Sequence, residues 1–178
     1  MTITVTPETF HFVAFDAAYT LRIAQRVAAL IGIDDIDINI EIDETNPLQR
    51  IDVTATPSLI TIAPLSGALE DTRRPRQQGE LATTVAMAKG MLRAHDRLRG
   101  GFADAPADAD LTLPQAAAWD SYIMARISRF DIDVRKQAWV YNFRNRHGFT
   151  DAVDTTFEKI WNTPSITWAE LNALSNSF

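Results

Sequence analysis

Cysteine is absent from this chain, which excludes disulfide bonds, thiolate-bound zinc and thiol nucleophiles. The absence agrees with a reducing compartment. Long apolar runs are also absent, because none approaches the ~20 residues that a membrane-spanning helix requires. Residues 1–7 have neither the basic region nor the apolar run of a secretion signal. We therefore expect a cytoplasmic protein that has no membrane partner.

The sequence also lacks the short motifs of several catalytic and nucleotide-binding sites. It contains no glycine-rich phosphate-binding loop, no H-E-x-x-H zinc motif and no G-x-S-x-G nucleophile turn. Acidic residues outnumber basic ones by 23 to 17, so the net charge is −6. Binding to nucleic acid rests on a basic surface, and this charge argues against it. We expect no cofactor and no bound metal.

What is present is a strong period of two in residues 36–43, which read I-D-I-N-I-E-I-D. This alternation puts the isoleucines on one face of a strand and the polar side chains on the other. Residues 50–55 alternate as well, and the turn-forming residues 45–47 between the two segments predict a hairpin. With further strands expected at 10–15 and 59–63, we predict a mainly antiparallel N-terminal sheet of three to four strands.

Helical periodicity dominates the rest of the chain. One early helix ends at Gly32, and about five helices are expected from residue 80 onward. Gly90, inside the first of these, costs about 1 kcal/mol relative to alanine, which indicates close packing against a neighbour. Strands followed by helices predict an α+β fold. We expect one domain, residues 1–178, with an α/β-sheet half (1–79), a helical half (80–178) and a possible internal boundary at 100–112.

The acidic face of the 36–43 strand is the first candidate site. Asp37, Glu41 and Asp43, together with Asp34, Asp35 and Glu44, could bind Ca²⁺ or Mg²⁺, since hard cations take clustered carboxylates. However, alternate residues on a strand lie about 6.5–7 Å apart, whereas a cation needs oxygens from several directions. A solvated face that opposes edge aggregation explains these residues better.

Residues 66–76 form the second candidate, a connection dense in both charges. Arg73, Arg74 and Arg76 could bind a carboxylate or phosphate ligand through their forked donors. Glu70 and Asp71 lie within a few positions of the arginines and could instead pair with them. Such pairs would pin the connection to the body of the protein or to a second subunit, and we favour this structural interpretation.

Residues 141–151 form the third candidate. Arg144, Arg146 and His147 end one helix and Asp151 begins the next, so that each charge complements a helix dipole. The functional alternative makes His147 a general acid or base oriented by Asp151. His95 is a further catalytic candidate, and the two arginines are candidate ligand-binding residues.

The segments G-A-L-E-D-T-R-R-P-R-Q, A-H-D-R-L-R, A-A-W-D-S-Y and F-R-N-R-H-G-F-T-D resemble a family of bacterial proteins with no assigned activity. The resemblance covers most of the chain from about Gly67 on. It implies a soluble cytosolic bacterial protein, and it carries over neither a catalytic residue nor a reaction.

The leading functional prediction is a non-catalytic structural or interaction protein that associates with itself as a homo-oligomer. The alternative is a small-molecule or metal-dependent hydrolase whose site lies between the 67–76 loop and the 144–151 helix junction. A small anionic ligand is a possible partner in either case. We also predict that Arg73 or Arg74, and one of Arg144 and Arg146, are at least partly buried in carboxylate pairs, either within the monomer or across a self-interface.

Overall fold

The computed structural model describes all residues, 1–178, and the chain divides into two compact units. Unit 1 is Met1–Ala94 and unit 2 is His95–Phe178. The division lies inside helix α2 (Glu80–Arg99), between the boundary expected after residue 79 and the possible boundary expected at 100–112. No helix combines the length and the apolar character that crossing a membrane requires.

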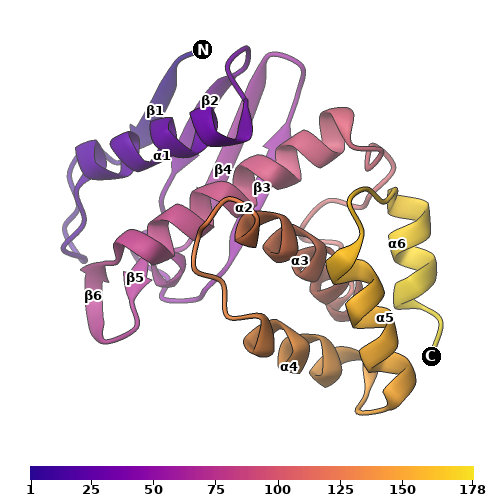
Figure 1. Cartoon of the computed structure of the whole chain (residues 1–178). Coiled ribbons are helices and arrows are strands. Elements are labelled where there is room, and N and C mark those ends of the chain that lie inside the picture. The colour runs from indigo at the N-terminus through magenta and orange to yellow at the C-terminus, as the bar shows by residue number, and fades with distance from the viewer. The chain divides into compact units, whose positions relative to one another are not determined.

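A four-stranded mixed sheet forms the centre of unit 1, with the strand order β1-β2-β4-β3 (Figure 1). The strands are β1 (Ile3–Thr6), β2 (Asp37–Glu41), β3 (Ile51–Ala55) and β4 (Leu59–Pro64). β1, β2 and β4 run parallel, and only β3 is antiparallel to its neighbour β4. The predicted mainly antiparallel sheet is therefore wrong, although the α+β class is right.

A helical crossover explains the first of the parallel pairs. β1 and β2 are joined by helix α1 (Ala17–Ile31), and a parallel pair requires such a crossover. The predicted hairpin between residues 36–43 and 50–55 does not form, because β4 inserts between β2 and β3. The hairpin in this region joins β3 to β4, through a turn in which Thr56 and Leu59 exchange backbone hydrogen bonds.

The alternation of residues 36–43 is confirmed. Ile38 and Ile40 are fully buried, while Asp37 and Glu41 are exposed on the opposite face of β2. Helix α2 packs on the isoleucine face so closely that a Cβ on Gly90 would lie 2.7 Å from Cγ2 of Ile62. The close approach predicted from this glycine is therefore present.

Residues 10–15 are not the first strand, which is instead β1. Only Ala14 makes a bridge, to Gln77 in a hairpin that lies where the sequence predicted an irregular connection. This hairpin consists of β5 (Glu70–Asp71) and β6 (Arg74–Gln78), and it follows a short 3-10 turn, η1 (Ser66–Ala68). Hydrogen bonding between β5 and β6 gives the charged connection a defined shape.

Unit 2 is helical. Its helices after α2 are α3 (Leu113–Ser128), α4 (Lys136–His147), α5 (Asp151–Asn162) and α6 (Trp168–Ser175). The five helices expected from residue 80 onward are therefore present. Local caps fix their ends, as at Thr167, whose hydroxyl accepts from the Glu170 amide while the Glu170 carboxylate accepts from the Thr167 amide. The core is rich in aromatic rings, including Phe102 stacked on Trp119 with ring centroids 4.8 Å apart.

Candidate functional site

The two carboxylates of the β5–β6 hairpin bind backbone rather than arginine side chains. Asp71 accepts a hydrogen bond of 2.9 Å from the backbone N–H of Arg73. Glu70 accepts one of 3.1 Å from the backbone N–H of Arg76 and another of 3.2 Å from the Ser66 hydroxyl. These acids therefore brace the hairpin from within, and the expected arginine pairs that would pin it to the body of the protein do not form.

The consequence is that the hairpin arginines keep their guanidinium groups available. Arg73, Arg74 and Arg76 are all exposed, and none forms an ion pair within the chain. The predicted burial of Arg73 or Arg74 in a carboxylate pair within the monomer is thus wrong. The physical reason is that each nearby carboxylate already accepts hydrogen bonds from the hairpin backbone.

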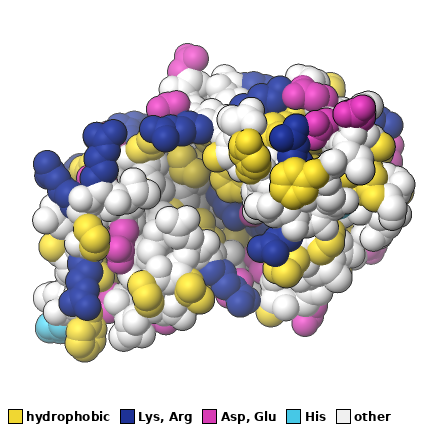
Figure 2. Space-filling model, turned by 90° about the horizontal axis from the view of Figure 1, so that it is seen from below, with side chains coloured by type: hydrophobic (Ala, Val, Ile, Leu, Met, Phe, Trp, Pro, Cys, Tyr) yellow, Lys and Arg dark blue, Asp and Glu magenta, His cyan; other side chains and the backbone are white.

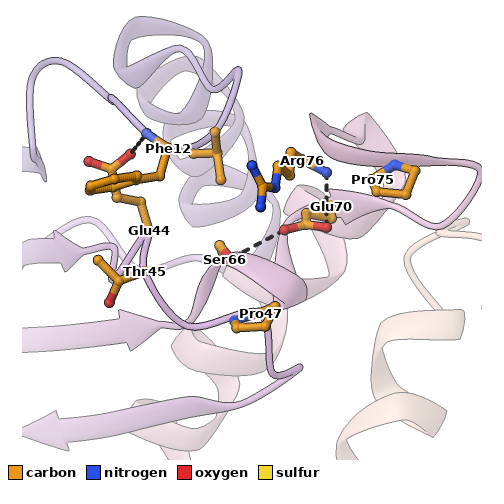
Figure 3. Close-up of a pocket in the computed structure, with 9 residues that line it drawn as sticks. Phe12, Glu44, Thr45, Pro47, Ser66, Glu70, Pro75 and Arg76 are labelled. Carbon is orange, nitrogen blue, oxygen red and sulfur yellow. Dashed lines mark hydrogen bonds between the residues drawn. The ribbon is translucent and has the colours of Figure 1, made fainter.

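A pocket of about 440 Å³ opens beside this hairpin (Figure 3). Its polar lining consists of Arg76, two carboxylates and two hydroxyls, and its apolar lining comes from three segments of unit 1. These residues are Phe12, Val13, Glu44, Thr45, Pro47, Ser66, Glu70, Pro75 and Arg76. The mixture of apolar walls with a few convergent polar groups is typical of small-molecule sites.

Glu44 shapes the wall of the pocket opposite the hairpin. One of its carboxylate oxygens accepts hydrogen bonds from the backbone N–H groups of His11 and Phe12, at 2.7 and 2.6 Å. The amide of Phe12, followed by that of His11, lowers the pKa of Glu44, which is therefore ionised at neutral pH. The bonded segment presents the Phe12 ring to the pocket, where 63% of the residue stays exposed.

Arg76 is held in an uncommon backbone conformation at the edge of the pocket. Its φ of 62° lies in the left-handed region, which non-glycine residues rarely adopt. The Glu70 carboxylate accepts a hydrogen bond from the N–H of Arg76, and the carbonyl of Arg76 accepts one of 2.8 Å from the N–H of Ala14. In Figure 3 its guanidinium projects from the hairpin toward the segment that carries Phe12. Such over-determined backbone outliers concentrate at ligand sites.

Several basic side chains lie on the surface around the hairpin despite the acidic net charge of the chain. Figure 2 shows several Lys or Arg side chains on the side where Figure 1 places β5 and β6, with hydrophobic side chains among them and few acidic ones. Arg73 and Arg74 belong to this hairpin but do not line the pocket. Arg73 and Arg74 therefore add positive charge beside the pocket, and Glu70 and Asp71 of the same hairpin offset part of that charge.

In unit 2, the predicted carboxylate pair of the second arginine-rich segment is confirmed for Arg144. Its Nε lies 2.7 Å from one oxygen of Asp154, and its Nη2 contacts the other oxygen. The two side chains are 26% and 38% exposed, so the pair is partly buried. The hydrogen bond from Arg144 lowers the pKa of Asp154. Arg146 is exposed, and the partner in the pair is Asp154 rather than Asp151.

Both ring nitrogens of His147 have partners other than Asp151. Nδ1 lies 3.0 Å from the Phe143 carbonyl and Nε2 lies 2.9 Å from the Ser175 hydroxyl. If Nδ1 carries the proton and donates to the carbonyl, Nε2 accepts from the hydroxyl. Burial lowers the pKa of His147, which keeps the ring neutral at pH 7.

The distance between His147 and Ser175 would allow the histidine to act as a base toward a serine nucleophile, but the surroundings of the pair do not favour catalysis. Ser175 is only 5% exposed and ends helix α6, where the helix dipole opposes a developing negative charge. The next amide, on Asn176, already donates to carbonyls of α6 and is not free to stabilise an oxyanion. A catalytic role for His147 stays a prediction, and this geometry lends it no support.

The remaining catalytic candidate, His95, lies beside a buried carboxylate. Its Nδ1 is 3.8 Å from Asp96, which accepts from the Trp119 indole at 3.0 Å and from Arg126 at 2.5 Å. These bonds tie α2 to α3 and explain Asp96 structurally. No group of three or more His, Asp or Glu side chains is placed to hold a metal ion.

The two arginine-rich segments belong to different units, the 73–76 hairpin to unit 1 and residues 144–151 to unit 2. A site shared between them therefore stays a prediction. Of the pocket residues, the sequence pointed to Arg76 as a contact for an anion and to Glu44 as a member of the acidic candidate cation site. Phe12 and Pro47 were missed because they lie in two separate connections, β1–α1 and β2–β3, that only the folded chain brings together.

Comparison with family models, with curated proteins and with solved structures found no match for this chain. The resemblance to an uncharacterised bacterial family therefore stays an expectation. A function for the chain has to be inferred from the geometry of its pocket.

Proposed function

We propose that the protein is a non-catalytic binding protein whose unit 1 holds a small carboxylate ligand with an apolar body. The observation that carries this proposal is Arg76, a guanidinium without an ion-pair partner in the chain that projects over a pocket with apolar walls. Arginine binds a carboxylate through two parallel N–H donors. Phe12, Pro47 and Pro75 supply apolar surface for the rest of the ligand.

The charges around the pocket narrow the class of ligand. Two carboxylates, Glu44 and Glu70, line it together with one guanidinium, so its own net charge is −1. These carboxylates repel a dianion such as a phosphate monoester about twice as strongly as a singly charged carboxylate ligand, because the Coulomb energy scales with the charge of the ligand. A carboxylate offers about four acceptor positions, so Glu44 can accept from an N–H of the ligand in addition to its backbone donors. An N-acylated amino acid combines the carboxylate, the N–H and an apolar side chain.

A binding experiment with matched probes tests the proposal. N-acetyl-phenylalanine and N-acetyl-leucine are titrated into the protein by calorimetry, alongside their uncharged carboxamides. We expect the acids to bind and the carboxamides to bind at least about tenfold more weakly, because only the acids can form the bidentate pair with Arg76.

Substitutions then locate the binding. Arg76→Gln should abolish the preference for the acids, and Arg76→Lys should restore part of it. Arg74→Gln is the matched control, since Arg74 lies on the same strand, is exposed and does not line the pocket. Equal affinity for acid and carboxamide, equal effects of the two glutamine variants, or no binding of any acid would each contradict the proposal.

A further inference from the structure

Strand β1 forms one edge of the four-stranded sheet, and β3 forms the other. Exposed edges offer unpaired N–H and C=O groups to other chains, and proteins commonly block them with charged residues or proline. β6 carries Arg74, Pro75 and Arg76, and β3 is preceded by Arg50, which forms a 2.9 Å ion pair with Asp52. β1 reads I-T-V-T and contains neither a charge nor a proline.

The parallel pairing with β2 fixes which backbone groups of β1 point outward. Ile38 donates to the carbonyl of Thr2 at 2.9 Å, and Ile42 donates to that of Thr6 at 2.8 Å. Because the direction of the backbone N–H and C=O groups alternates along a strand, those of Thr4 also point toward β2, whereas those of Ile3 and Val5 point away from it. The N–H and C=O of Ile3 and Val5 have no hydrogen-bond partner in the chain.

A second copy of β1 satisfies these groups completely. In an antiparallel pair about a two-fold axis through Thr4, Ile3 of each copy lies opposite Val5 of the other. Each such pair exchanges two hydrogen bonds, so all four outward groups of each strand are used. Pro7 has no N–H, so the ladder ends where the outward donors end. The two Thr4 residues meet on the axis as a pair without backbone bonds, about 4.5 Å apart between Cα atoms.

We infer that the chain forms a two-fold symmetric homodimer in which the β1 edges of two copies join their sheets into one. The uncharged edge suits this self-pairing, because any charge at the axis would face its own copy. Thr4 and Thr6 point to the polar face of the sheet and would form cross-strand pairs of β-branched residues. Figure 1 shows β1 at the rim of the sheet, with its outer side facing away from β2.

The first test measures the mass of the full chain by sedimentation as a function of concentration. Wild type should reach twice the mass of the chain. Val5→Pro should raise the dimer dissociation constant at least about tenfold, because proline removes an outward donor while the bonds to β2 remain. Val5→Ala is the matched control: it shortens the same side chain, keeps the N–H and should stay dimeric. Circular dichroism checks that each variant is folded.

The second test uses the absence of cysteine. Thr4→Cys should form a disulfide-linked dimer on oxidation, since the expected Cα separation lies within the disulfide range. Thr54→Cys is the matched control, as an exposed threonine on the opposite edge strand, β3, and it should remain uncrosslinked. A wild type that is monomeric at every concentration overturns the inference. The inference is also overturned if the Thr4→Cys variant crosslinks no better than the Thr54→Cys variant. A dimer that remains intact in the Val5→Pro variant overturns it as well.

Discussion

Replacing Gly90 with alanine tests the packing of helix α2 on the sheet. In an exposed helix this change stabilises a protein by about 1 kcal/mol. Here the new Cβ would lie 2.7 Å from Cγ2 and 2.9 Å from Cδ1 of Ile62, which is itself fully buried. Overpacking of this kind costs about 1–3 kcal/mol, so we expect a net loss of up to about 2 kcal/mol in the free energy of unfolding.

The sign of the effect should reverse when Ile62 is shortened. Ile62→Ala alone should cost about 2–5 kcal/mol through the cavity that it leaves. In that background Gly90→Ala meets no obstructing methyl group and should stabilise unit 1 by about 1 kcal/mol. Gly32→Ala is the control, because nothing lies within 4 Å of a Cβ there and its φ of +80° makes alanine unfavourable in either background.

All four tryptophans lie in unit 2, so their fluorescence does not report on this contact. Native-state hydrogen exchange of the Ile38 and Ile40 amides measures the stability of the sheet directly. If Gly90→Ala stabilises the wild-type sheet, or if its effect is the same in the Ile62→Ala background, the packing argument is refuted.

Two further predictions concern the register of β2 and the burial of His147. Ile38→Asp should unfold unit 1, because it places an unpaired charge at a fully buried position, whereas Glu41→Lys on the exposed face should change the free energy of unfolding by no more than about 0.5 kcal/mol. Thermal melts followed by circular dichroism compare the two variants. A cooperatively folded Ile38→Asp variant with an unchanged midpoint would rule out this register. The pKa of His147 is lowered by burial, so the unfolded chain takes up the proton first as pH falls below about 6.5. Unit 2 should therefore lose stability as the pH falls below about 6.5, measured by urea denaturation with tryptophan fluorescence. The His147→Gln variant should lose less stability over the same pH range, and equal losses in the two proteins would exclude this cause.

Local sequence determined much of the secondary structure, because its signals act over a few residues. The alternation in residues 36–43 fixed the buried face of β2, since side chains on a strand point to opposite sides in turn. Asp16 accepts from the Tyr19 amide at the start of α1, and Gly32 ends that helix at a φ of 80°. Thr167 and Glu170 begin α6 in the same local way. Each of these features needs only the geometry of its own turn or strand.

Strand partners were decided by tertiary structure, because a period of two says which side faces the core but not which strand lies alongside. Ile60 and Ile62 place β4 in the interior of the sheet, while β3, with its half-exposed Arg50–Asp52 ion pair, takes the edge. The same limit applies to the pocket. Local spacing suggested that Glu70 and Asp71 bind arginine side chains, but the folded hairpin directs them to amide groups and leaves Arg76 without a carboxylate partner. Which donor a carboxylate meets depends on the path of the backbone, and that path is set by contacts between distant segments.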